Sequence, residues 1–501
     1  MSLKSPDNRF LRLCTAEQSR QLDHDTIQTF GLNGNLLMEI AGLKASEFIR
    51  QTVGNNRHGV YVCGKGNNAG DAFVIARYLA DSPKHRITIC LISGDQQLSD
   101  DAEKNLSLLR KLSDHSSHIT FTGNLSSDLL QDADYIVDGM IGTGLKSELR
   151  EPLHSAVKSI NSSDTLTFSL DIPTGLNCNT GQILGESVQA DHTITFGTNK
   201  IGFYLGSGPE RCGNIHFAEL PFPEHHRNHS AVLIHSNIKP ELQTGPLPAS
   251  HKYEKGTVHI IAGSEGMTGA AIMSARSAWK AGAGAVILYC PKGLLHIYEQ
   301  TLPEIIKVPL GSEHHMFFKP EHVPAVKNRI SEKPGPVLAG PGIGRSEETR
   351  EFILELTNSF KHPLILDADA LAGWDELKNY DTSGWILTPH IGELKNSMNI
   401  SFSSDEERLS QLKKLSKESR CTILSKGYPL ITATPDDGVF ITGYDTRIFS
   451  RAGFGDVLAG TIAGYLAIEN NTTDAIIKSL VENFEIANCV KDPEPRTIYG
   501  R

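Results

Sequence analysis

The sequence has few cysteines, no excess of positive charge and no long apolar run. Its 501 residues include 8 cysteines without a CxxC pair, a pattern typical of reduced, mostly buried thiols. Asp and Glu number 58 against 48 Lys and Arg, a net charge of −10, which argues against non-specific binding to nucleic acid or anionic membranes. The first residues hold no apolar signal region, and no stretch approaches the roughly 18 apolar residues that span a bilayer. We therefore expect a cytoplasmic protein that binds neither nucleic acid nor membrane.

The composition is that of an ordinary folded chain, with 39% hydrophobic and 21% charged residues. At roughly 150 residues per domain, its length allows two or three domains. A chain this acidic has to hold any phosphate-bearing ligand locally, with backbone N–H groups and helix N-termini.

Two stretches share the pattern of a β-branched strand followed by glycines and then a helix. They are residues 60–80 and 258–290, and this order is the opening of a βαβ unit in a parallel sheet covered by helices. Two such openings predict two α/β domains. The stretch between them is rich in Pro, His, Asn and Ser, so we predict domains at 1–225 and 251–501 joined by a linker at 226–250.

Polar residues follow the predicted strands in both halves. They include Asp138, Asp171 and Thr174 in the first half, and the aspartates of residues 363–371 and His390 in the second. The carboxyl ends of parallel strands meet at one edge of a sheet, where open α/β sheets bind their ligands. We therefore expect these side chains to line sites, with turn formation as the alternative for any single residue.

The segment CGKGNNAGD, residues 63–71, places glycines between a strand and a helix. Its spacing differs from the dinucleotide-binding fingerprint, and no GK[ST] follows, so a plain strand-to-helix turn is the alternative. Asn67, Asn68 and Asp71 nevertheless put three oxygen-bearing side chains at the helix start, whereas a cap needs one. The two additional oxygen-bearing side chains indicate a bound ligand.

Asn68, Asp138 and Thr174 offer amide, carboxylate and hydroxyl oxygens without Cys or His. Such a set suits a hard cation such as potassium or magnesium. Asp171 enters the same site from a strand end, where a carboxylate acts as general base or holds a hydroxyl group.

In the second half, residues 451–460 read RAGFGDVLAG. Gly453 and Gly455 leave backbone N–H groups free to face an anion, at the start of a helix whose N-terminus favours negative charge. This arrangement suits phosphoryl transfer with Asp456 as the base that takes a proton from an attacking hydroxyl. The alternative is that Asp456 simply caps the helix. The run of glycines and alanines argues against this, because a backbone loses its side chains where something bulky approaches it.

Several histidines have zinc-like spacing. His225, His226 and His229 form HHxxH in the Pro-rich stretch, without a helix pattern, a Cys or an HExxH glutamate. We interpret them, and also His314 and His315, as solvated residues rather than metal ligands.

Taken in order, the motifs resemble one family. Four are similar to NAD(P)H-hydrate epimerase domains: LLMEIAG (36–42), CGKGNNAGD (63–71), VDGMIGTGLKSELREP (137–152) and SLDIPTG (169–175). Six are similar to NAD(P)H-hydrate dehydratases: HKYEKGTVHIIAGSEGMTGAA (251–271), GPGIG (340–344), LDADAL (366–371), LTPHIGE (387–393), SKG (425–427) and AGFGDVLAG (452–460). Together they cover nearly the whole chain in the order of the bacterial bifunctional repair enzymes.

The resemblance implies an α/β protein of two three-layer αβα domains, Rossmann-like at the N-terminus and ribokinase-like at the C-terminus. It implies that the first domain epimerises the R and S forms of hydrated NADH and NADPH. The second would dehydrate the S form at the expense of ADP, giving AMP and phosphate, with Mg²⁺ beside the nucleotide and K⁺ in the epimerase. We also expect a homo-oligomer.

The resemblance also assigns site residues by position. The potassium ligands are Asn68, Asp138 and Thr174. Asp171 and Asp456 are the catalytic residues of the two domains, and both also contact substrate. The other substrate contacts are Asn67, Asn68, Ala69, Gly70, Asp71, Gly142, Thr143, Gly144, Leu145, Lys146, Ser147, Glu148, Ala270, Gly342 and His390. The adenine nucleotide contacts are Lys426, Gly427, Tyr428, Pro429, Leu430 and Gly455.

Four positions depart from the family pattern. Ile40 replaces an Asn, Ala69 and Ala72 replace glycines, and Phe454 replaces a Thr. We expect Ile40 to remove a polar contact of the epimerase and Phe454 to narrow the phosphate loop.

Two other functions fit the residues alone. One is a small-molecule kinase fused to an accessory domain, since the second half's chemistry begins as a kinase's does. In the other, the first half is a non-catalytic nucleotide-binding or interaction module. The argument against it is that the chain retains four candidate site residues, Asn68, Asp138, Asp171 and Thr174.

Overall fold

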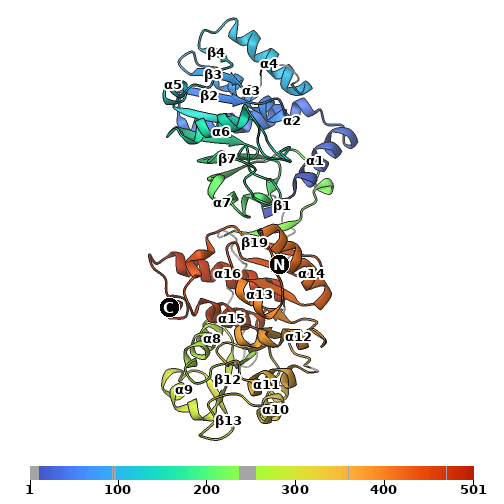
Figure 1. Cartoon of the computed structure of the whole chain (residues 1–501), viewed down its shortest axis with the longest axis vertical. Helices are drawn as coiled ribbons and strands as arrows, with labels where there is room; N and C mark the ends of the chain where they lie inside the picture. Colours follow the sequence, from blue (N-terminus) through green and yellow to red (C-terminus); the bar gives the residue numbers. More distant parts are fainter. Residues whose placement is uncertain are drawn as a thin grey trace, which may run out of the picture. The chain divides into compact units, whose positions relative to one another are not determined.

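The computed structural model describes residues 11–92, 94, 98–235, 256–358, 360–469 and 471–500. They fall into two compact units, each with its own sheet and helices (Figure 1). One unit holds residues 11–232 and 404–406, and the other holds residues 233–403 and 407–500. Among the described residues, no helix is long and apolar enough to span a membrane.

The N-terminal unit is built on a parallel sheet with strand order β4-β3-β2-β5-β6-β7-β9. Its strands are β2 (His58–Cys63), β3 (Arg86–Leu91), β4 (Ile119–Thr122), β5 (Tyr135–Gly139), β6 (Leu166–Leu170), β7 (His192–Phe196) and β9 (Asn214–Ala218). β2 and β5 are buried along their whole length, as expected for parallel strands covered on both faces.

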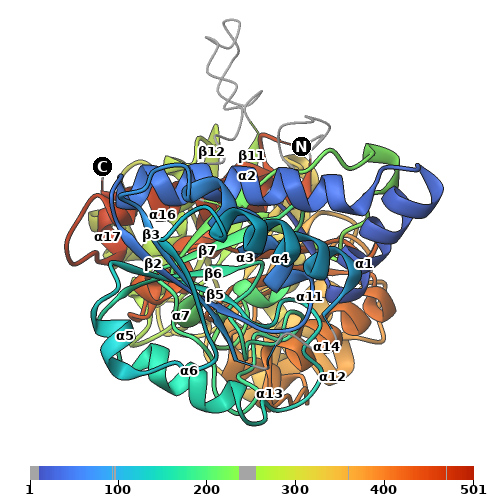
Figure 2. The same ribbon diagram turned by 90° about the horizontal axis from the view of Figure 1, so that it is seen from above.

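Helices cover the two faces of this sheet (Figure 2). They are α1 (Ala16–His24), η2 (Asp25–Thr29), α2 (Gly34–Val53), α3 (Asn67–Leu79), α4 (Asp100–Ser113), α5 (Ser127–Gln131), α6 (Leu153–Asn161), η3 (Ile201–Phe203), α7 (Gly208–Arg211) and η4 (Glu224–His226). Residues of α2, α3 and α4 share one apolar core with the sheet, and residues of α5 and α6 share another on the opposite face. The predicted three-layer architecture is confirmed for this unit.

Short strands complete the unit. β1 (Arg12–Cys14) pairs in parallel with β8 (Asn199–Lys200) and antiparallel with β10 (Ala231–Ile234). β10 therefore occupies part of the range predicted as a linker, and residues 236–250 of that range lie outside the described residues. The pairing matters for function because it fixes Lys200, the last residue of β8.

The C-terminal unit has the strand order β13-β12-β11-β14-β15-β16-β17-β18-β19. Its strands are β11 (Thr257–Ile261), β12 (Ala285–Pro291), β13 (Ile306–Leu310), β14 (Val337–Ala339), β15 (Leu364–Leu366), β16 (Ile386–Leu387), β17 (Thr422–Ser425), β18 (Ile431–Ala433) and β19 (Val439–Thr442). Neighbours from β13 to β17 are parallel, and β17, β18 and β19 are antiparallel.

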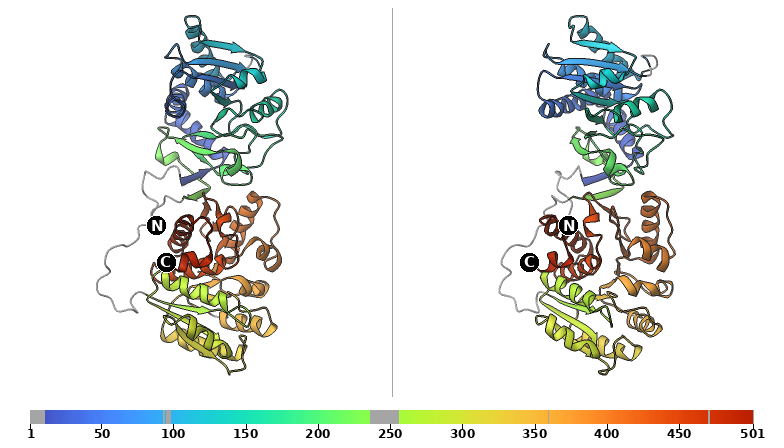
Figure 3. Two further views of the ribbon diagram at one scale, coloured as in Figure 1. Left: turned by 90° about the vertical axis from the view of Figure 1, so that its left-hand side faces the viewer. Right: turned by 60° about the vertical axis from the view of Figure 1, so that its left-hand side comes forward.

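Helices lie on both faces of this sheet too (Figure 3). They are α8 (Thr268–Lys280), η5 (Lys292–Leu294), α9 (Leu295–Thr301), η6 (Pro320–His322), α10 (Val323–Glu332), α11 (Glu347–Thr357), η7 (Ala368–Gly373), α12 (Trp374–Leu377), α13 (Ile391–Ser397), α14 (Asp405–Ser419), η8 (Thr446–Phe449), α15 (Phe454–Leu466), α16 (Thr472–Asn488) and α17 (Pro495–Tyr499). α8, α15 and α16 share one large apolar core with the strands. This unit also confirms the predicted α/β class.

The small residues of α15 serve helix packing. A Cβ on Gly460 would lie 2.2 Å from the carbonyl oxygen of Ser274, and one on Gly464 would lie 2.5 Å from that of Ala278. Both oxygens belong to α8, so these glycines allow two helices to approach closely. The bulky group that approaches this part of the run is therefore helix α8.

Candidate active sites

The N-terminal unit has a pocket of about 550 Å³ where the strand order reverses between β2 and β5. This reversal is the position at which open α/β sheets bind ligands. The start of α3 and the loop after β5 form one part of its lining, and residues of α1, η2 and α2 form another.

The polar residues at the start of α3 do not cap the helix. Gly66 is the N-cap residue, and no side chain bonds to the first turn. Asn67 accepts a hydrogen bond from the Ser99 hydroxyl at 2.6 Å, while Asn68 and Asp71 line the pocket. Asn68 and Asp71 therefore have oxygen atoms that can face a ligand, whereas the Asn67 amide oxygen already accepts a hydrogen bond.

Asp138 is fully buried, and neither it nor Thr174 lines the pocket. Its Oδ1 accepts from Thr174 Oγ1 at 2.7 Å and from the Met140 N–H at 3.2 Å. Its Oδ2 accepts from Ser169 Oγ and the Thr174 N–H, both at 2.9 Å. Burial raises the pKa of Asp138, and these hydrogen bonds act against the rise.

Asn68 lies beside this network. Its side chain is 6% exposed, and neither its amide oxygen nor its amide nitrogen has a hydrogen-bond partner. A buried amide without a partner costs roughly 1–3 kcal/mol, so its oxygen points to an absent ligand. Of the three predicted potassium ligands, Asn68 is the one with an unused oxygen.

Asp171 forms a buried ion pair with Lys200. It follows β6 with a φ of 63°, and its Oδ1 accepts from Lys200 Nζ. Lys200, 1% exposed, also donates to Thr195 Oγ1 at 2.6 Å and to the Thr198 carbonyl at 3.0 Å. Three acceptors therefore fix the ammonium group, which in turn fixes the Asp171 carboxylate at the pocket wall.

Two further acids face Asp171. Burial, together with the charges of Asp171 and Asp23, raises the pKa of Asp71 well above its ordinary value. Asp23 is open to the pocket, but surrounding protein and the charge of Asp171 raise its pKa to about 7. The pocket thus combines an ion-paired carboxylate with acids that favour their protonated form, as general acid–base catalysis requires.

Not every predicted contact reaches the pocket. Those that line it are Asn67, Asn68, Asp71, Gly142, Thr143, Gly144 and Asp171. Those that do not are Ala69, Gly70, Leu145, Lys146, Ser147 and Glu148. Ala69 is fully buried, a Cβ on Gly70 would lie 2.7 Å from Met38 Sδ, and Leu145 packs against an apolar core.

Asp23 and Lys200 also line the pocket, although no sequence motif singles them out. Lys200 ends the FGTNK segment after β7, so a charged residue after a predicted strand was its available signal. Asp23 lies near the end of α1, and no pattern marks it. Ile40 packs against the cluster of Leu22, Leu37 and their neighbours, so an apolar contact stands where a polar one was expected.

In the C-terminal unit the strand order reverses between β11 and β14. A Cβ on Gly342, in the loop after β14, would lie 2.9 Å from the Ala270 Cβ. These two predicted contacts therefore lie together near this reversal. The neighbouring strand ends supply Asp367 after β15, Thr388 after β16 and Lys426 after β17.

Lys426 and Asp367 form the polar centre of this edge. Lys426 Nζ lies 2.6 Å from Asp367 Oδ1, which also accepts from Thr388 Oγ1 at 2.7 Å. Burial alone would lower the pKa of Lys426, but the charges of Asp367 and Glu393 raise it. Lys426 is therefore a cation fixed at the end of the sheet.

Asp456 lies in the first turn of α15 without capping it, since Gly453 is the N-cap residue with φ 97° and no side chain bonds there. Burial and the charge of Asp367 raise the pKa of Asp456 to about 7, although Lys426 acts in the opposite direction. A Cβ on Gly455 would lie 3.2 Å from Lys426 Nζ, so the glycine turn lies close to this cation.

An apolar pocket of about 400 Å³ adjoins Lys426 and Gly455. Of the predicted nucleotide contacts, Lys426, Gly427, Tyr428, Leu430 and Gly455 line it, and Pro429 does not. The rest of the lining includes aromatic and aliphatic side chains: Tyr444, Phe449, Phe454, Leu458, Leu480 and Ile498. Such a lining suits a flat heteroaromatic ring.

Phe454 is 4% exposed and packs with Phe449, Val457 and Ile498. Its side chain therefore belongs to an apolar cluster and lines the pocket, rather than projecting into the glycine turn.

His390 lines the same pocket and also begins α13. Its Nδ1 accepts from the Glu393 N–H at 3.1 Å, and Glu393 Oε2 accepts from the His390 N–H at 2.8 Å. This reciprocal pair is a capping box. Its side chain is 57% exposed, so His390 combines a structural role with an open face toward the pocket.

Comparisons with known proteins match both halves of the chain to known families. Residues 34–202 match the family described as YjeF-related protein N-terminus, and residues 258–497 match the family described as NAD(P)H-hydrate dehydratase. The bifunctional NAD(P)H-hydrate repair enzyme Nnr of Salinibacter ruber is 33% identical over 90% of this chain and 87% of its own length. The enzyme of that name from Escherichia coli is 29% identical over 92% of this chain and 86% of its own.

A solved structure adds a similar protein for the second unit. It is an ADP/ATP-dependent NAD(P)H-hydrate dehydratase of Bacillus subtilis, co-crystallised with ATP and Mg²⁺, with 21% identity and a TM-score of 0.40 over 49% of this chain and 84% of that one. From the family matches and the relatives over most of its length, the chain belongs to the family of bifunctional NAD(P)H-hydrate repair enzymes, with an epimerase domain followed by a dehydratase domain.

Proposed function

We propose that this chain returns hydrated NADH and NADPH to their reduced forms. The N-terminal domain interconverts the R and S epimers, and the C-terminal domain dehydrates the S form while ADP becomes AMP and phosphate. The observation that carries the proposal is the placement of Asp456 at the start of α15, near the Lys426–Asp367 pair and the apolar pocket. A cytoplasmic location and a homo-oligomeric assembly stay predictions.

In the epimerase pocket, the acidic side chains give a proton to the hydroxyl on the ring carbon and take one from the water that replaces it. Asp71 is the candidate donor, since its raised pKa favours the protonated form; its proton lets the hydroxyl leave as water. The ring nitrogen stabilises the resulting cation, and water returns on the opposite face, losing a proton to the Asp171 carboxylate. Lys200 keeps Asp171 oriented toward the pocket.

Potassium fits this pocket through Asn68. Its buried amide oxygen lacks a partner, whereas Asp138 and Thr174 already bond to each other, so they would share their oxygens with the ion. When bound, the ion supplies positive charge beside the substrate and fixes the loop after β5. Amide, carboxylate and hydroxyl oxygens are donors suited to such a hard cation.

Removal of potassium is expected to slow epimerisation. Exchange of K⁺ for tetramethylammonium should reduce the rate by about tenfold or more, a loss of roughly 1.4 kcal/mol, because Asn68 then loses its ligand. Asn68→Ala should be slow in both salts. The exposed Asn124→Ala is the matched control and should keep the native dependence. If the native chain epimerised at the same rate in both salts, the epimerase would not use potassium.

In the dehydratase site, Asp456 takes the proton from the substrate hydroxyl as its oxygen attacks the terminal phosphorus of ADP. AMP leaves, and the backbone N–H groups at the glycine turn and the Lys426 ammonium stabilise the transferred phosphoryl group. Electron donation from the ring nitrogen then expels phosphate and leaves a ring cation. Loss of a proton from the neighbouring ring carbon to solvent forms the double bond and restores the reduced nicotinamide. Mg²⁺ would enter with the nucleotide and neutralise its phosphates.

The dehydratase rate is expected to depend on pH through Asp456. A base with a pKa of about 7 is mostly protonated below that pH, so kcat/KM should rise as the pH increases through about 7 and level off above it. Measuring kcat/KM from pH 5.5 to 9 with the S epimer and ADP tests this rise. A rate that is constant from pH 5.5 to 8 would show that Asp456 does not control it.

Product analysis separates repair from the kinase alternative. Supplied with the S epimer, ADP and Mg²⁺, the chain should release one phosphate per reduced nicotinamide formed. A stable phosphorylated substrate, with no gain of reduced-nicotinamide absorbance, would identify a kinase instead.

A further inference from the structure

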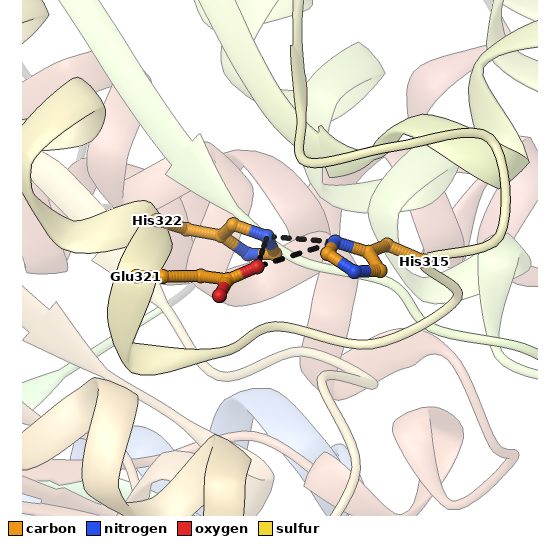
Figure 4. A group of neighbouring side chains, drawn as sticks. All are labelled: His315, Glu321 and His322. Atoms are coloured by element: carbon orange, nitrogen blue, oxygen red, sulfur yellow. Dashed lines mark hydrogen bonds and ion pairs between the residues drawn. The ribbon is translucent and has the colours of Figure 1, made fainter.

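Three side chains outside both pockets converge on one point in the C-terminal unit (Figure 4). His315 comes from the loop after β13, and Glu321 and His322 come from η6. His315 Nδ1 lies 3.1 Å from His322 Nε2 and 3.7 Å from Glu321 Oε1, and the last two atoms are 3.9 Å apart. The same three atoms thus form a small, nearly regular triangle.

These separations match the first coordination shell of a transition metal. Zinc binds imidazole nitrogen and carboxylate oxygen at about 2.0–2.2 Å, so two ligand atoms on one ion lie roughly 3–4 Å apart. Two histidines and one glutamate are a donor set that zinc takes in proteins, with water in the fourth position. Figure 4 shows the rings and the carboxylate pointing toward one another from two segments.

The backbone leaves space at this point. Gly311 has a φ of 74°, and a Cβ there would lie 1.9 Å from His315 Nδ1 and 2.7 Å from His322 Nε2. Any other residue at this position would fill the volume among the ligand atoms. His322 is 3% exposed, while the Glu321 side chain is 64% exposed, so the site has a rigid inner ligand and an outer ligand open to solvent.

Two contacts have to change when an ion binds. The Ser312 N–H lies 3.4 Å from His315 Nδ1, the atom that would bind the ion, and this long hydrogen bond would open. The Lys319 N–H lies 3.2 Å from His322 Nδ1, which places the ring proton on Nε2, facing His315. Binding at Nε2 moves this proton to Nδ1 and opens the Lys319 contact, which is at the long end of hydrogen-bond distances. The turn keeps its hydrogen bond from the His322 N–H to the Lys319 carbonyl at 3.0 Å.

We propose that His315, His322 and Glu321 bind one divalent transition-metal ion of the zinc class, separately from the two catalytic pockets. The ion fastens the loop after β13 to η6. That loop supplies the Met316 carbonyl that accepts from the Glu265 N–H at 3.2 Å, beside the loop after β11. The ion thereby stiffens a segment that supports the dehydratase edge.

The burial of His315 corrects the interpretation of that residue, though not of His314, as solvated. His314 is exposed, but His315 is half-buried, and its partner follows seven residues later. The pair is joined by a loop and a short 3-10 helix, so no helical spacing marked it in the sequence.

Zinc titration of the chelator-treated full chain tests the site. By calorimetry, the native chain should bind one zinc equivalent that His315→Gln lacks. Glu321→Gln should weaken this binding by about tenfold, since one of three ligands is lost. The adjacent exposed His314→Gln is the matched control and should bind like the native chain. Excess Mg²⁺ should not compete, because it prefers oxygen ligands.

Thermal unfolding gives a second readout that does not depend on the buried His322. Zinc should raise the Tm of the native chain and of His314→Gln, because a ligand of the folded state stabilises it, and should leave the Tm of His315→Gln unchanged. The proposal is overturned if the native chain binds no zinc at stoichiometric concentration. It is equally overturned if His315→Gln and Glu321→Gln bind the same number of ions with the native affinity, since the cluster is then only hydrogen-bonded.

Discussion

Asp456→Asn is expected to reduce the rate of S-epimer dehydration by about 10²–10⁴-fold, the range for loss of a general base. The substitution keeps the size of the side chain but removes its ability to accept the hydroxyl proton. Because burial and Asp367 raise the pKa of Asp456 to about 7, the native carboxylate is a much better proton acceptor than an ordinary aspartate. Absorbance of reduced nicotinamide, with the S epimer, ADP and Mg²⁺, measures the loss.

The epimerase should be unaffected by Asp456→Asn, since its residues belong to the other domain. The matched control is Asp381→Asn, whose side chain is 77% exposed, and it should keep the native rate in both assays. Retention of more than about a tenth of the native dehydration rate by Asp456→Asn would be too small a loss for a general base, and the phosphoryl-transfer mechanism would then need another one.

Asp171→Asn is expected to leave the R epimer unconverted, with a loss of about 10²–10⁴-fold in epimerisation, while dehydration of the S epimer continues at the native rate. Asn suits this position better than Ala does, because Asp171 has a φ of 63° and Asn tolerates the left-handed region. The amide oxygen also preserves an acceptor for Lys200. Ala would leave a buried ammonium without its carboxylate, at a cost of roughly 3–5 kcal/mol.

Separate R and S substrates measure this difference directly. Asp114→Asn, an exposed residue after α4 in the same domain, is the control and should epimerise like the native chain. If Asp171→Asn converted the R epimer at the native rate, Asp71 and Asp23 would be the remaining candidates for the proton acceptor.

The sequence predicts which residues lie at the sheet edges, because a residue that follows a buried strand in the sequence also lies at the end of that strand in the fold. Asp138, Asp171 and Lys426 illustrate this, since each lies within or directly after a parallel strand. Register then brings them to one edge in each domain, as the paired strands show.

Residues positioned by tertiary contacts escaped prediction. Asp23 reaches the epimerase pocket only because α1 lies beside it, and Lys200 is fixed by β8 pairing with β1, near the start of the chain. Gly460 and Gly464 show a related difficulty. From the sequence alone, a glycine required by helix packing cannot be distinguished from one required by a ligand. A local sequence pattern does not show which distant helix, strand or ligand lies against a given residue.

The central claim is that one chain carries two independent sites acting in sequence, and complementation tests it most directly. Asp171→Asn and Asp456→Asn are each supplied with pure R epimer, ADP and Mg²⁺, separately and then mixed. Each variant alone should form no reduced nicotinamide beyond the uncatalysed rate, whereas the mixture should form it steadily, because the S epimer made by Asp456→Asn diffuses to Asp171→Asn. A mixture as inactive as either variant alone would contradict the account.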